Sequence, residues 1–444
     1  MKTPICDFIE RYAASDAVRA HMPGHKGKEL LGMERLDITE MSGADSLFKA
    51  DGIIAESERN LTSIFDTGSS LYSCEGSSLC VRAMMYLARL NAGEERGYIL
   101  AGRNAHSSLI SAAALLDFDI EWLYPSDSEA YLKCEITPAA LEKRLGECEK
   151  KPFCVYITSP DYLGNIADIG ALSEICDRYG VLLVVDNAHG AYLKFLDEDI
   201  HPITLGAHMC CDSAHKTLPA LTGGAYLHIS KRAPKIVFEY AKDAMSLFAS
   251  TSPSYLILSS LDRVNKYLDC EYRSRLLTFK ESITSLKARL TEDGYDLLGD
   301  EVLKIVINAR SRGYSGHTLA RALEEKGIYC EFCDGDFLVL MLTPETTSEE
   351  LNRIENALLS IPASDKMPAP VVKIEPPEVK MSIREAIMSQ KTRVPISQSL
   401  GRVSASVNVI CPPAVSLIVA GEVYNESVIS ALKYYGFEHC DVVK

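Results

Sequence analysis

A single lysine in the middle of the chain is the first residue whose surroundings suggest chemistry. Lys216 stands in the stretch DSAHKTLPALTGG (Asp212–Gly224), with hydroxyl residues and a histidine around it and an apolar run ending in glycines after it. A lysine that only solvates a helix face usually has charged neighbours at helical spacing, and Lys216 has none nearby. Burial lowers the pKa of a lysine because it penalises the charged form, and a neutral amine can attack a carbonyl. Lys216 is therefore a candidate nucleophile.

A second polar cluster follows the apolar stretch VLLVVD, which ends at Asp186 and is followed three residues later by His189. A carboxylate at a strand end can be a metal ligand, the partner of a heterocyclic nitrogen or, equally well, a structural N-cap. Lys216 comes 216 − 186 = 30 residues after Asp186, which leaves room for one more strand and its connection. Because open parallel sheets bind ligands at the carboxyl ends of their strands, we expect both side chains to reach one crevice.

Two further clusters lie at expected strand-to-helix turns. Gly76, Ser77 and Ser78 could offer backbone N–H groups and hydroxyls to a phosphate at a helix N-terminus, although an ordinary serine cap explains them as well. They lack the lysine of a P-loop and the spacing of a dinucleotide loop. His106 follows the stretch YILA and could stack on a flat ligand. Together with Asp186 and Lys216, these residues suit a ligand with a phosphate, a basic ring nitrogen and an aldehyde, a combination found in pyridoxal 5′-phosphate.

The elements that must position these residues are short apolar strands alternating with helices, a pattern typical of an α/β domain with a largely parallel sheet. From about Leu303 the order changes to a strand (LKIVINA), a helix (SGHTLARALEEKG), two strands (IYCEFCD and DFLVLML) and a helix (TSEELNRIENALLSI), which predicts a smaller α+β unit. A linker is expected at Met367–Lys380, and we expect domains at 1–290, 291–362 and 363–444. In the first domain, strands are expected at Tyr98–Ala101, Phe153–Thr158, Val181–Asp186 and Ala225–Ile229, and helices at Ser78–Leu90 and Ile169–Tyr179, the latter closed by Gly180.

Composition narrows the class of partner. The 444 residues carry a net charge of −15, which argues against nucleic acid or an anionic membrane as the main partner. The 14 cysteines are scattered through apolar runs, as reduced thiols in a cytosol would be, and the pair Cys330 and Cys333 lacks the further ligands of a zinc site, so no metal is expected. The first residues, MKTPICDFIERYAAS, do not predict a signal peptide, and no apolar run is long enough to span a membrane. We therefore expect a cytoplasmic protein.

The chain contains a series of motifs, which are HMPGHKG (21–27), DITEMSGADSL (37–47), RNAHSS (103–108), ITSPDYLGNIADI (157–169), DNAHGAY (186–192), SAHKTLPALT (213–222), GRVSA (401–405) and PPAVSLIVAGE (412–422). In this order, along nearly the whole chain, they resemble the motifs of the bacterial ornithine/lysine/arginine decarboxylase family in its short form. This resemblance implies an α/β, aspartate aminotransferase-like fold of the pyridoxal-phosphate-dependent type I, with smaller α+β domains at the C-terminal end. It also implies a homodimer with active sites at the subunit interface.

The resemblance also implies a role for each matching residue. Lys216 would form the imine with the cofactor, and Asp186 would keep the pyridine nitrogen protonated. Ala188 would lie against the ring, His189 would reach its phenolic oxygen, and His106 would stack on the opposite face. The phosphate would be bound by Gly76, Ser77, Ser78, Ser213 and His215.

The implied reaction is α-decarboxylation of a basic amino acid to an amine that can serve as a polyamine precursor. Arginine is favoured over lysine and ornithine because short members of the family are often assigned to it. Lys216, or a nearby histidine such as His215, would protonate Cα after CO2 leaves. The cationic end of the substrate needs an anionic contact; Glu422 is the first candidate, although a solvated surface glutamate explains it equally well, and Asp45 and Asp161 are weaker candidates.

The sequence departs from the family pattern at three places; the first leaves the implied cofactor chemistry unchanged, and the other two bear on substrate identity because they are expected to border the substrate or the partner subunit. Asn187 stands where an acidic residue is commoner, Gly223 and Gly224 stand where a glutamine usually follows LPALT, and PPAVS replaces PPGIP. An aminotransferase or a carbon–carbon lyase on the same fold would show the same Asp186 and Lys216, and would be distinguished by its products. A catalytically idle relative is disfavoured by the intact set of candidate residues. A nucleotide-binding protein is disfavoured because no glycine-rich fingerprint follows the early strands.

Overall fold

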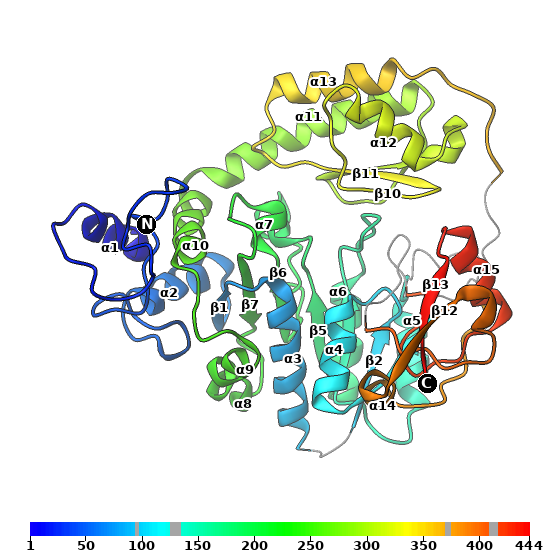
Figure 1. Ribbon diagram of the computed structural model, residues 1–444, viewed down its shortest axis with the longest axis horizontal. Coiled ribbons are helices and arrows are strands. Elements are labelled where there is room, and N and C mark those ends of the chain that lie inside the picture. The colour runs from blue at the N-terminus through cyan, green and yellow to red at the C-terminus, as the bar shows by residue number, and fades with distance from the viewer. Residues whose placement is uncertain (94–96, 125–134, 369–373, 408–415) are drawn as a thin grey trace. The chain divides into compact units, whose positions relative to one another are not determined.

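The computed structural model describes residues 1–93, 97–124, 135–368, 374–407 and 416–444 (Figure 1). The middle of the expected linker, 369–373, and the first four residues of the stretch PPAVSLIVAGE therefore lie outside the described residues. Two compact units make up the chain. The first comprises Met1–Glu95, Phe153–Val155 and Ile169–Arg275, and the second Arg96–Pro152, Tyr156–Asp168 and Leu276–Lys444. Because these units interleave along the chain, the linear division at 290 and 362 stays a prediction.

The larger sheet has seven strands in the order β1-β7-β6-β5-β4-β2-β3. Strand β5 pairs in parallel with β6, and β2 with β3, whereas β7 is antiparallel to both of its neighbours. This is the mixed, mostly parallel sheet of an α/β protein, as expected from the alternation of strands and helices. The strands are β1 (Ser69–Ser73), β2 (Tyr98–Gly102), β3 (Asp119–Leu123), β4 (Cys154–Thr158), β5 (Leu182–Asp186), β6 (Met209–Asp212) and β7 (Ala225–Ile229).

The first unit owes its core to apolar strands and to the helices that cover them. Every residue of β5, β6 and β7 is buried, as expected for strands that are covered on both faces. Helix α6 (Ile169–Tyr179) ends as predicted, because Gly180 takes a φ of +60° that a glycine adopts without strain. The other helices of this unit are α1 (Pro4–Ala13), α2 (Ile53–Phe65), α3 (Gly76–Ala92), α7 (Ala214–Thr217), α8 (Lys235–Glu239), α9 (Ala241–Phe248) and α10 (Tyr255–Tyr267), with short turns η1 (Leu47–Lys49), η3 (Ala191–Phe195) and η4 (Leu268–Tyr272).

The second unit contains a smaller antiparallel sheet of four strands in the order β10-β11-β9-β8, with α11, α12 and α13 on one side of it (Figure 1). The α+β pattern expected after Leu303 is therefore confirmed, although β10 is only two residues long. A separate pair, β12 and β13, lies near the C-terminus. The bounds are α4 (Ser107–Leu116), α5 (Pro138–Gly146), α11 (Arg273–Glu292), β8 (Leu297–Leu298), β9 (Lys304–Asn308), η5 (Ala309–Arg312), α12 (Gly316–Glu324), β10 (Phe332–Cys333), β11 (Phe337–Met341), α13 (Ser348–Leu359), α14 (Ile383–Met388), β12 (Lys391–Pro395), η6 (Ile396–Gln398), α15 (Glu426–Tyr434) and β13 (His439–Val443).

In the described part of the chain, every helix is too short or too polar to cross a lipid bilayer.

Candidate active site

The N-terminus of α3 and the segment after β6 meet in the first unit. The hydroxyl of Ser213 donates a hydrogen bond of 2.7 Å to Oγ of Ser77. Gly76 opens α3 with a φ of +71°, and its N–H donates to the carbonyl of Gly223 at 2.8 Å, so this N–H is already used within the protein. Ser78 follows in the first turn and is partly exposed. The start of this 17-residue helix, lined with hydroxyls, suits an anion, because helix N-termini carry positive partial charge.

Asp186 ends β5, and its carboxylate is 3% exposed. Its Oδ1 accepts a hydrogen bond of 3.2 Å from the N–H of Ala188 and one of 3.5 Å from the thiol of Cys211 on β6. Ala188 and His189 are also buried. The carboxylate is therefore held in place by its own turn and by the neighbouring strand.

Lys216 lies in α7, where its Nζ is 3.1 Å from Nε2 of His189. This contact brings the candidate amine to the turn that carries Asp186, as the spacing of the two residues suggested. Two buried polar atoms in the same segments, Oδ1 of Asn187 and Oγ1 of Thr217, have no hydrogen-bond partner within the described structure. Buried polar atoms without partners are rare in folded proteins and are often satisfied by a ligand or by water.

His215 precedes Lys216, and its Nδ1 lies 2.9 Å from the carbonyl oxygen of Gly224. The neighbouring Gly223 has a φ of +96°, and a Cβ there would come within 2.9 Å of the carbonyl oxygen of Cys74. A glutamine at this position would be strained and would clash with the backbone. The departure from the family pattern at Gly223 is therefore explained by the close approach of two loops in this chain.

His106 belongs to the second unit, where it caps the N-terminus of α4. Its Nδ1 accepts a hydrogen bond of 3.2 Å from the N–H of Ser108 and lies 2.9 Å from the hydroxyl of the same residue. The ring itself is exposed. Its position in the described structure is thus set by a local helix cap.

Glu422 is neither a surface residue nor a carboxylate open to a substrate. It is 2% exposed and forms a bidentate ion pair with Arg103 within the second unit. Nη1 and Nη2 of Arg103 donate to Oε1 and Oε2 of Glu422 at 2.6 and 2.7 Å. Nε of Arg103 donates to the carbonyl of Ser416, and the guanidinium lies over the ring of Trp122, 4.9 Å from its centroid. Because both carboxylate oxygens are occupied by a buried guanidinium, our first choice for the substrate contact has to be corrected.

The prediction that Asp45 contacts the substrate has to be corrected for a similar reason. Its carboxylate accepts hydrogen bonds from backbone N–H groups just before and in the first turn of α2, including 2.9 Å bonds from Gly52 and Ile54. Burial by itself would raise the pKa of Asp45, but these N–H groups outweigh it and the pKa is lowered. The residue is a helix cap, for which a carboxylate is among the best side chains.

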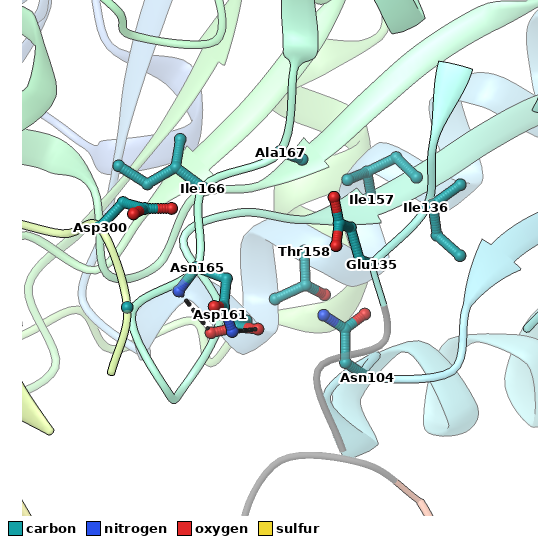
Figure 2. Close-up of a pocket in the computed structure, with 11 residues that line it drawn as sticks. Asn104, Glu135, Ile136, Ile157, Thr158, Asp161, Asn165, Ile166, Ala167 and Asp300 are labelled. Atoms are coloured by element: carbon teal, nitrogen blue, oxygen red, sulfur yellow. Dashed lines mark hydrogen bonds between the residues drawn. The ribbon is translucent and has the colours of Figure 1, made fainter. Parts of the chain in front are cut away.

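Asp161 is the candidate that lines a pocket. The pocket lies in the second unit, has a volume of about 270 Å³ and includes three carboxylates, Glu135, Asp161 and Asp300 (Figure 2). Asp161 is 3% exposed, and its carboxylate accepts bonds of 2.9 and 2.7 Å from the backbone and side chain of Asn165. Burial raises the pKa of Asp161 to about 6, against the lowering effect of Asn165 and of the buried Lys304. The other lining residues are Asn104, Ile136, Ile157, Thr158, Ile166, Ala167 and Gly299.

Sequence reasoning missed a buried polar network directly before the lysine segment. Asp212, the last residue of β6, binds the side chains of Asn187, His201 and His228. Asp212 was visible as the residue that ends an apolar stretch four positions before Lys216. The two histidines gave no signal of their own, because a lone histidine in an apolar run is usually a core residue.

The similarity to known proteins extends over almost the whole chain. Residues 3–293 match the model of the Orn/Lys/Arg decarboxylase major domain, and residues 365–439 match that of the C-terminal domain of the same family. An arginine decarboxylase of Bacillus subtilis is 25% identical over 471 residues, covering 99% of this chain and 94% of the relative. The uncharacterised protein YaaO of the same organism is 27% identical, covering 95% of this chain and 92% of the relative.

A solved structure supports the fold. The constitutive lysine decarboxylase of Escherichia coli aligns with a TM-score of 0.79 and 18% identity, over 100% of this chain and 82% of that one. The expected aspartate aminotransferase-like fold is therefore confirmed. Because the major-domain model alone covers well over half of the chain, the protein belongs to the Orn/Lys/Arg decarboxylase family and is an amino acid decarboxylase for a basic substrate.

Proposed function

We propose that the protein removes the α-carboxylate of arginine, in preference to lysine or ornithine, with pyridoxal 5′-phosphate held by Lys216. The observation that carries this proposal is the contact of 3.1 Å between Nζ of Lys216 and Nε2 of His189, on the turn that begins with the buried Asp186. A lysine amine and a carboxylate for the ring nitrogen are the usual partners of this cofactor, and here they follow the adjacent strands β6 and β5. The choice of arginine is supported by the relatives of similar length that carry this name.

The residues present fit the cofactor. Lys216 would hold its aldehyde carbon, Asp186 its ring nitrogen and His189 its phenolic oxygen, and Ala188 would lie against the ring. His106 would cover the opposite face. The hydroxyls of Ser77 and Ser213, already in contact, would bind the phosphate at the start of α3 with Gly76, Ser78 and His215. The unpartnered buried atoms of Asn187 and Thr217 support a ligand in this region.

The bound cofactor supplies a carbonyl for the substrate amine and a protonated ring that accepts the electron pair left by departing CO2. The protein's own groups do the rest. Asp186, buried and held by two donors, keeps the proton on the ring nitrogen. Lys216 would hold a proton at Nζ and deliver it to Cα of the substrate. His189 lies within hydrogen-bond reach of Nζ and exchanges that proton with it, and His215 is the second candidate donor.

We propose Asp161 as the contact for the cationic end of the substrate. The side chains of Asp161, Asp300 and Glu135 give the pocket negative charge, and none of its described lining residues is a lysine or an arginine (Figure 2). The isoleucines beside them suit the aliphatic part of a basic side chain. A bound cation would favour the ionised form of Asp161, whose pKa is raised to about 6 by burial, against the lowering effect of Asn165 and Lys304.

We further propose that the protein is a cytoplasmic homodimer without a nucleic acid or membrane partner. The amine that it produces would enter polyamine synthesis. The negative net charge and the 12 free cysteines among the described residues support a reducing compartment and a small-molecule substrate. Light scattering coupled to size exclusion would measure the mass of the assembly directly.

The test of the function is an assay of purified protein incubated with pyridoxal phosphate. Absorbance reports the lysine-bound cofactor, and released CO2 is measured with arginine, lysine and ornithine in parallel. We expect the absorbance band and CO2 release, highest with arginine. A keto acid as the product would contradict decarboxylation and indicate an aminotransferase instead.

A further inference from the structure

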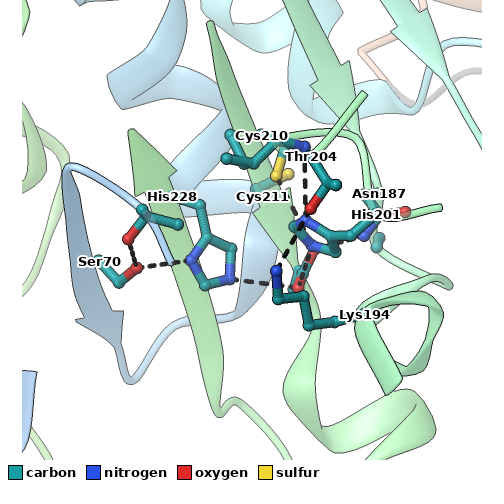
Figure 3. Close-up of polar contacts among 12 residues, drawn as sticks. Ser70, Asn187, Lys194, His201, Thr204, Cys210, Cys211 and His228 are labelled. Atoms are coloured by element: carbon teal, nitrogen blue, oxygen red, sulfur yellow. Dashed lines mark hydrogen bonds and ion pairs between the residues drawn. The ribbon is translucent and has the colours of Figure 1, made fainter. Parts of the chain in front are cut away.

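The carboxylate of Asp212 is the centre of a fully buried polar network in the first unit. Its Oδ1 accepts a bond of 2.6 Å from the side-chain amide of Asn187, and its Oδ2 accepts bonds of 3.1 and 3.2 Å from Nε2 of His201 and of His228. The side chains of Asp212, His201 and His228 are all 0% exposed. Figure 3 shows His228 continuing the network to Ser70 through its second nitrogen.

The hydrogen bonds fix the charge of this network. Nδ1 of His201 accepts the N–H of Ile203, so the proton of this ring is on Nε2, facing Asp212. Burial lowers the pKa of His228, against the raising effect of the Asp212 carboxylate. Burial would raise the pKa of Asp212, but the charges of His201 and His228 and their hydrogen bonds outweigh burial and lower it. Asp212 is therefore an ionised, buried carboxylate held by three N–H donors.

The same cluster contains a set of groups that could bind a metal, since His201, Cys210 and Asp212 each place one ligand atom within 4.8 Å of the others. Both ring nitrogens of His201 are already engaged in hydrogen bonds. Burial raises the pKa of Cys210 well above its usual range, which keeps the thiol protonated, whereas metals bind thiolates. The arrangement is that of a hydrogen-bond network.

The network joins the two segments that carry the candidate catalytic residues. Asn187 directly follows Asp186, and Asp212 comes four residues before Lys216. A backbone bond of 3.0 Å from the N–H of Asn187 to the carbonyl of Cys211 runs beside the side-chain bond between Asn187 and Asp212. The amide of Asn187 and the carboxylate of Asp212 thus add a side-chain link, beside the backbone pairing of β5 and β6, between the Asp186 turn and the segment that leads to Lys216.

We propose that Asp212 is a positioning residue, which through Asn187 sets the alignment of Asp186 with Lys216. This inference rests on the proposed function, since it concerns the same site. It also explains the amide at position 187: an acidic residue there would place a second carboxylate within hydrogen-bond distance of buried Asp212, where neither charge is solvated. Residues 187 and 212 have to be complementary, one a donor and the other an acceptor.

The test exchanges the two side chains. N187D puts two carboxylates together, and we expect it to lower kcat about 100-fold, because small misplacements of reacting groups cost rates of this size. D212N should lower kcat less, since an amide still fits the space and can bond to a flipped Asn187. In N187D/D212N the amide introduced at position 212 can donate to the carboxylate introduced at position 187, while its oxygen accepts from both histidines. The kcat of this exchange variant should be at least tenfold higher than that of N187D. The absorbance of the lysine-bound cofactor should also return.

D177N, a carboxylate-to-amide change at an exposed ion pair with Arg232, is the matched control and should leave all values unchanged. Thermal unfolding of each variant separates folding from positioning. If the exchange variant recovers its melting temperature but not its kcat, the pair is purely structural and the proposal is overturned. One equivalent of zinc in the purified protein would also overturn it, because the cluster would then be a metal site. If the unmodified protein neither binds pyridoxal phosphate nor releases CO2, the proposed function fails instead; the coupling between 187 and 212 would then still be read in the melting temperatures.

Discussion

Nζ of Lys216 lies 3.1 Å from Nε2 of His189, although the two residues are 27 positions apart and follow different strands. One of the two nitrogens must donate the shared proton and the other accept it. The candidate nucleophile and the imidazole therefore share one proton between the segments that follow β5 and β6. This pairing is the basis for the first prediction.

Replacing Lys216 with alanine should abolish both the absorbance of the lysine-bound cofactor and CO2 release, because no other amine in the described site replaces it. K231A is the control, since Lys231 is exposed and its ion pair is with the exposed Asp66. Absorbance scans of both variants with pyridoxal phosphate, followed by CO2 assays, check the prediction. An intact band or measurable turnover in K216A would rule out the role proposed for this residue.

Asp186 can be tested by an isosteric change. D186N keeps the shape of the side chain but removes the negative charge that would hold a proton on the cofactor ring. We expect kcat to fall about 10²–10³-fold, the usual loss when an electrostatic stabiliser is removed. Cofactor binding, measured by absorbance, should weaken as well. Unchanged kcat in D186N would mean that the carboxylate only caps its own turn through Ala188.

The ion pair of Arg103 and Glu422 is predicted to be structural. Removing one partner leaves a buried charge alone, which costs about 3–5 kcal/mol, so R103M and E422Q should both unfold at clearly lower urea concentrations. R103M/E422M, which removes both charges, should be more stable than R103M. Measuring the KM for arginine in E422Q tests the alternative. A large rise in KM with unchanged stability would contradict the structural role and indicate that Glu422 contacts the substrate.

Asp161 should make both stability and substrate binding depend on pH. Burial raises its folded-state pKa from 3.8 to about 6, so the folded protein holds this proton more tightly than the unfolded chain does. The resulting stabilisation, about 3 kcal/mol, is fully present below pH 3.8 and is lost as the pH rises through about 6. D161N should lack this part of the pH dependence in urea unfolding measured between about pH 4.5 and 7.5.

Substrate binding should show the opposite trend, because only ionised Asp161 attracts a cation. The KM for arginine should rise as the pH falls below about 6 in the unmodified protein, and should be high and independent of pH over this range in D161N. D300N, a change at an exposed carboxylate of the same pocket, is the comparison and should keep the pH dependence. If D161N retains the KM of the unmodified protein, the cationic end binds elsewhere.

The sequence alone determined the local elements and the motif residues. The apolar run VLLVVD predicted a buried strand, and β5 ends at Asp186 as expected. The helix expected at Ile169–Tyr179 is observed with the same bounds and the glycine end. Strands β1 and β3 were not predicted, and the strand expected between Asp186 and Lys216, which is β6, was given no bounds. Three of the five residues of β1, SSLYS, are serines, which are not among the β-branched and aromatic residues from which strands are recognised. The burial of β1 comes from its neighbours in the sheet.

What surrounds each carboxylate was decided only by the tertiary structure. Asp45, Asp161, Asp212 and Glu422 are four similar side chains in the sequence, and the fold makes them a helix cap, a pocket wall, the centre of a histidine network and half of an ion pair. The residues that decide these roles lie far away along the chain, as Arg103 does for Glu422. A carboxylate's function depends on which donors reach it and on how far water is excluded, and both are properties of packing that no local pattern encodes.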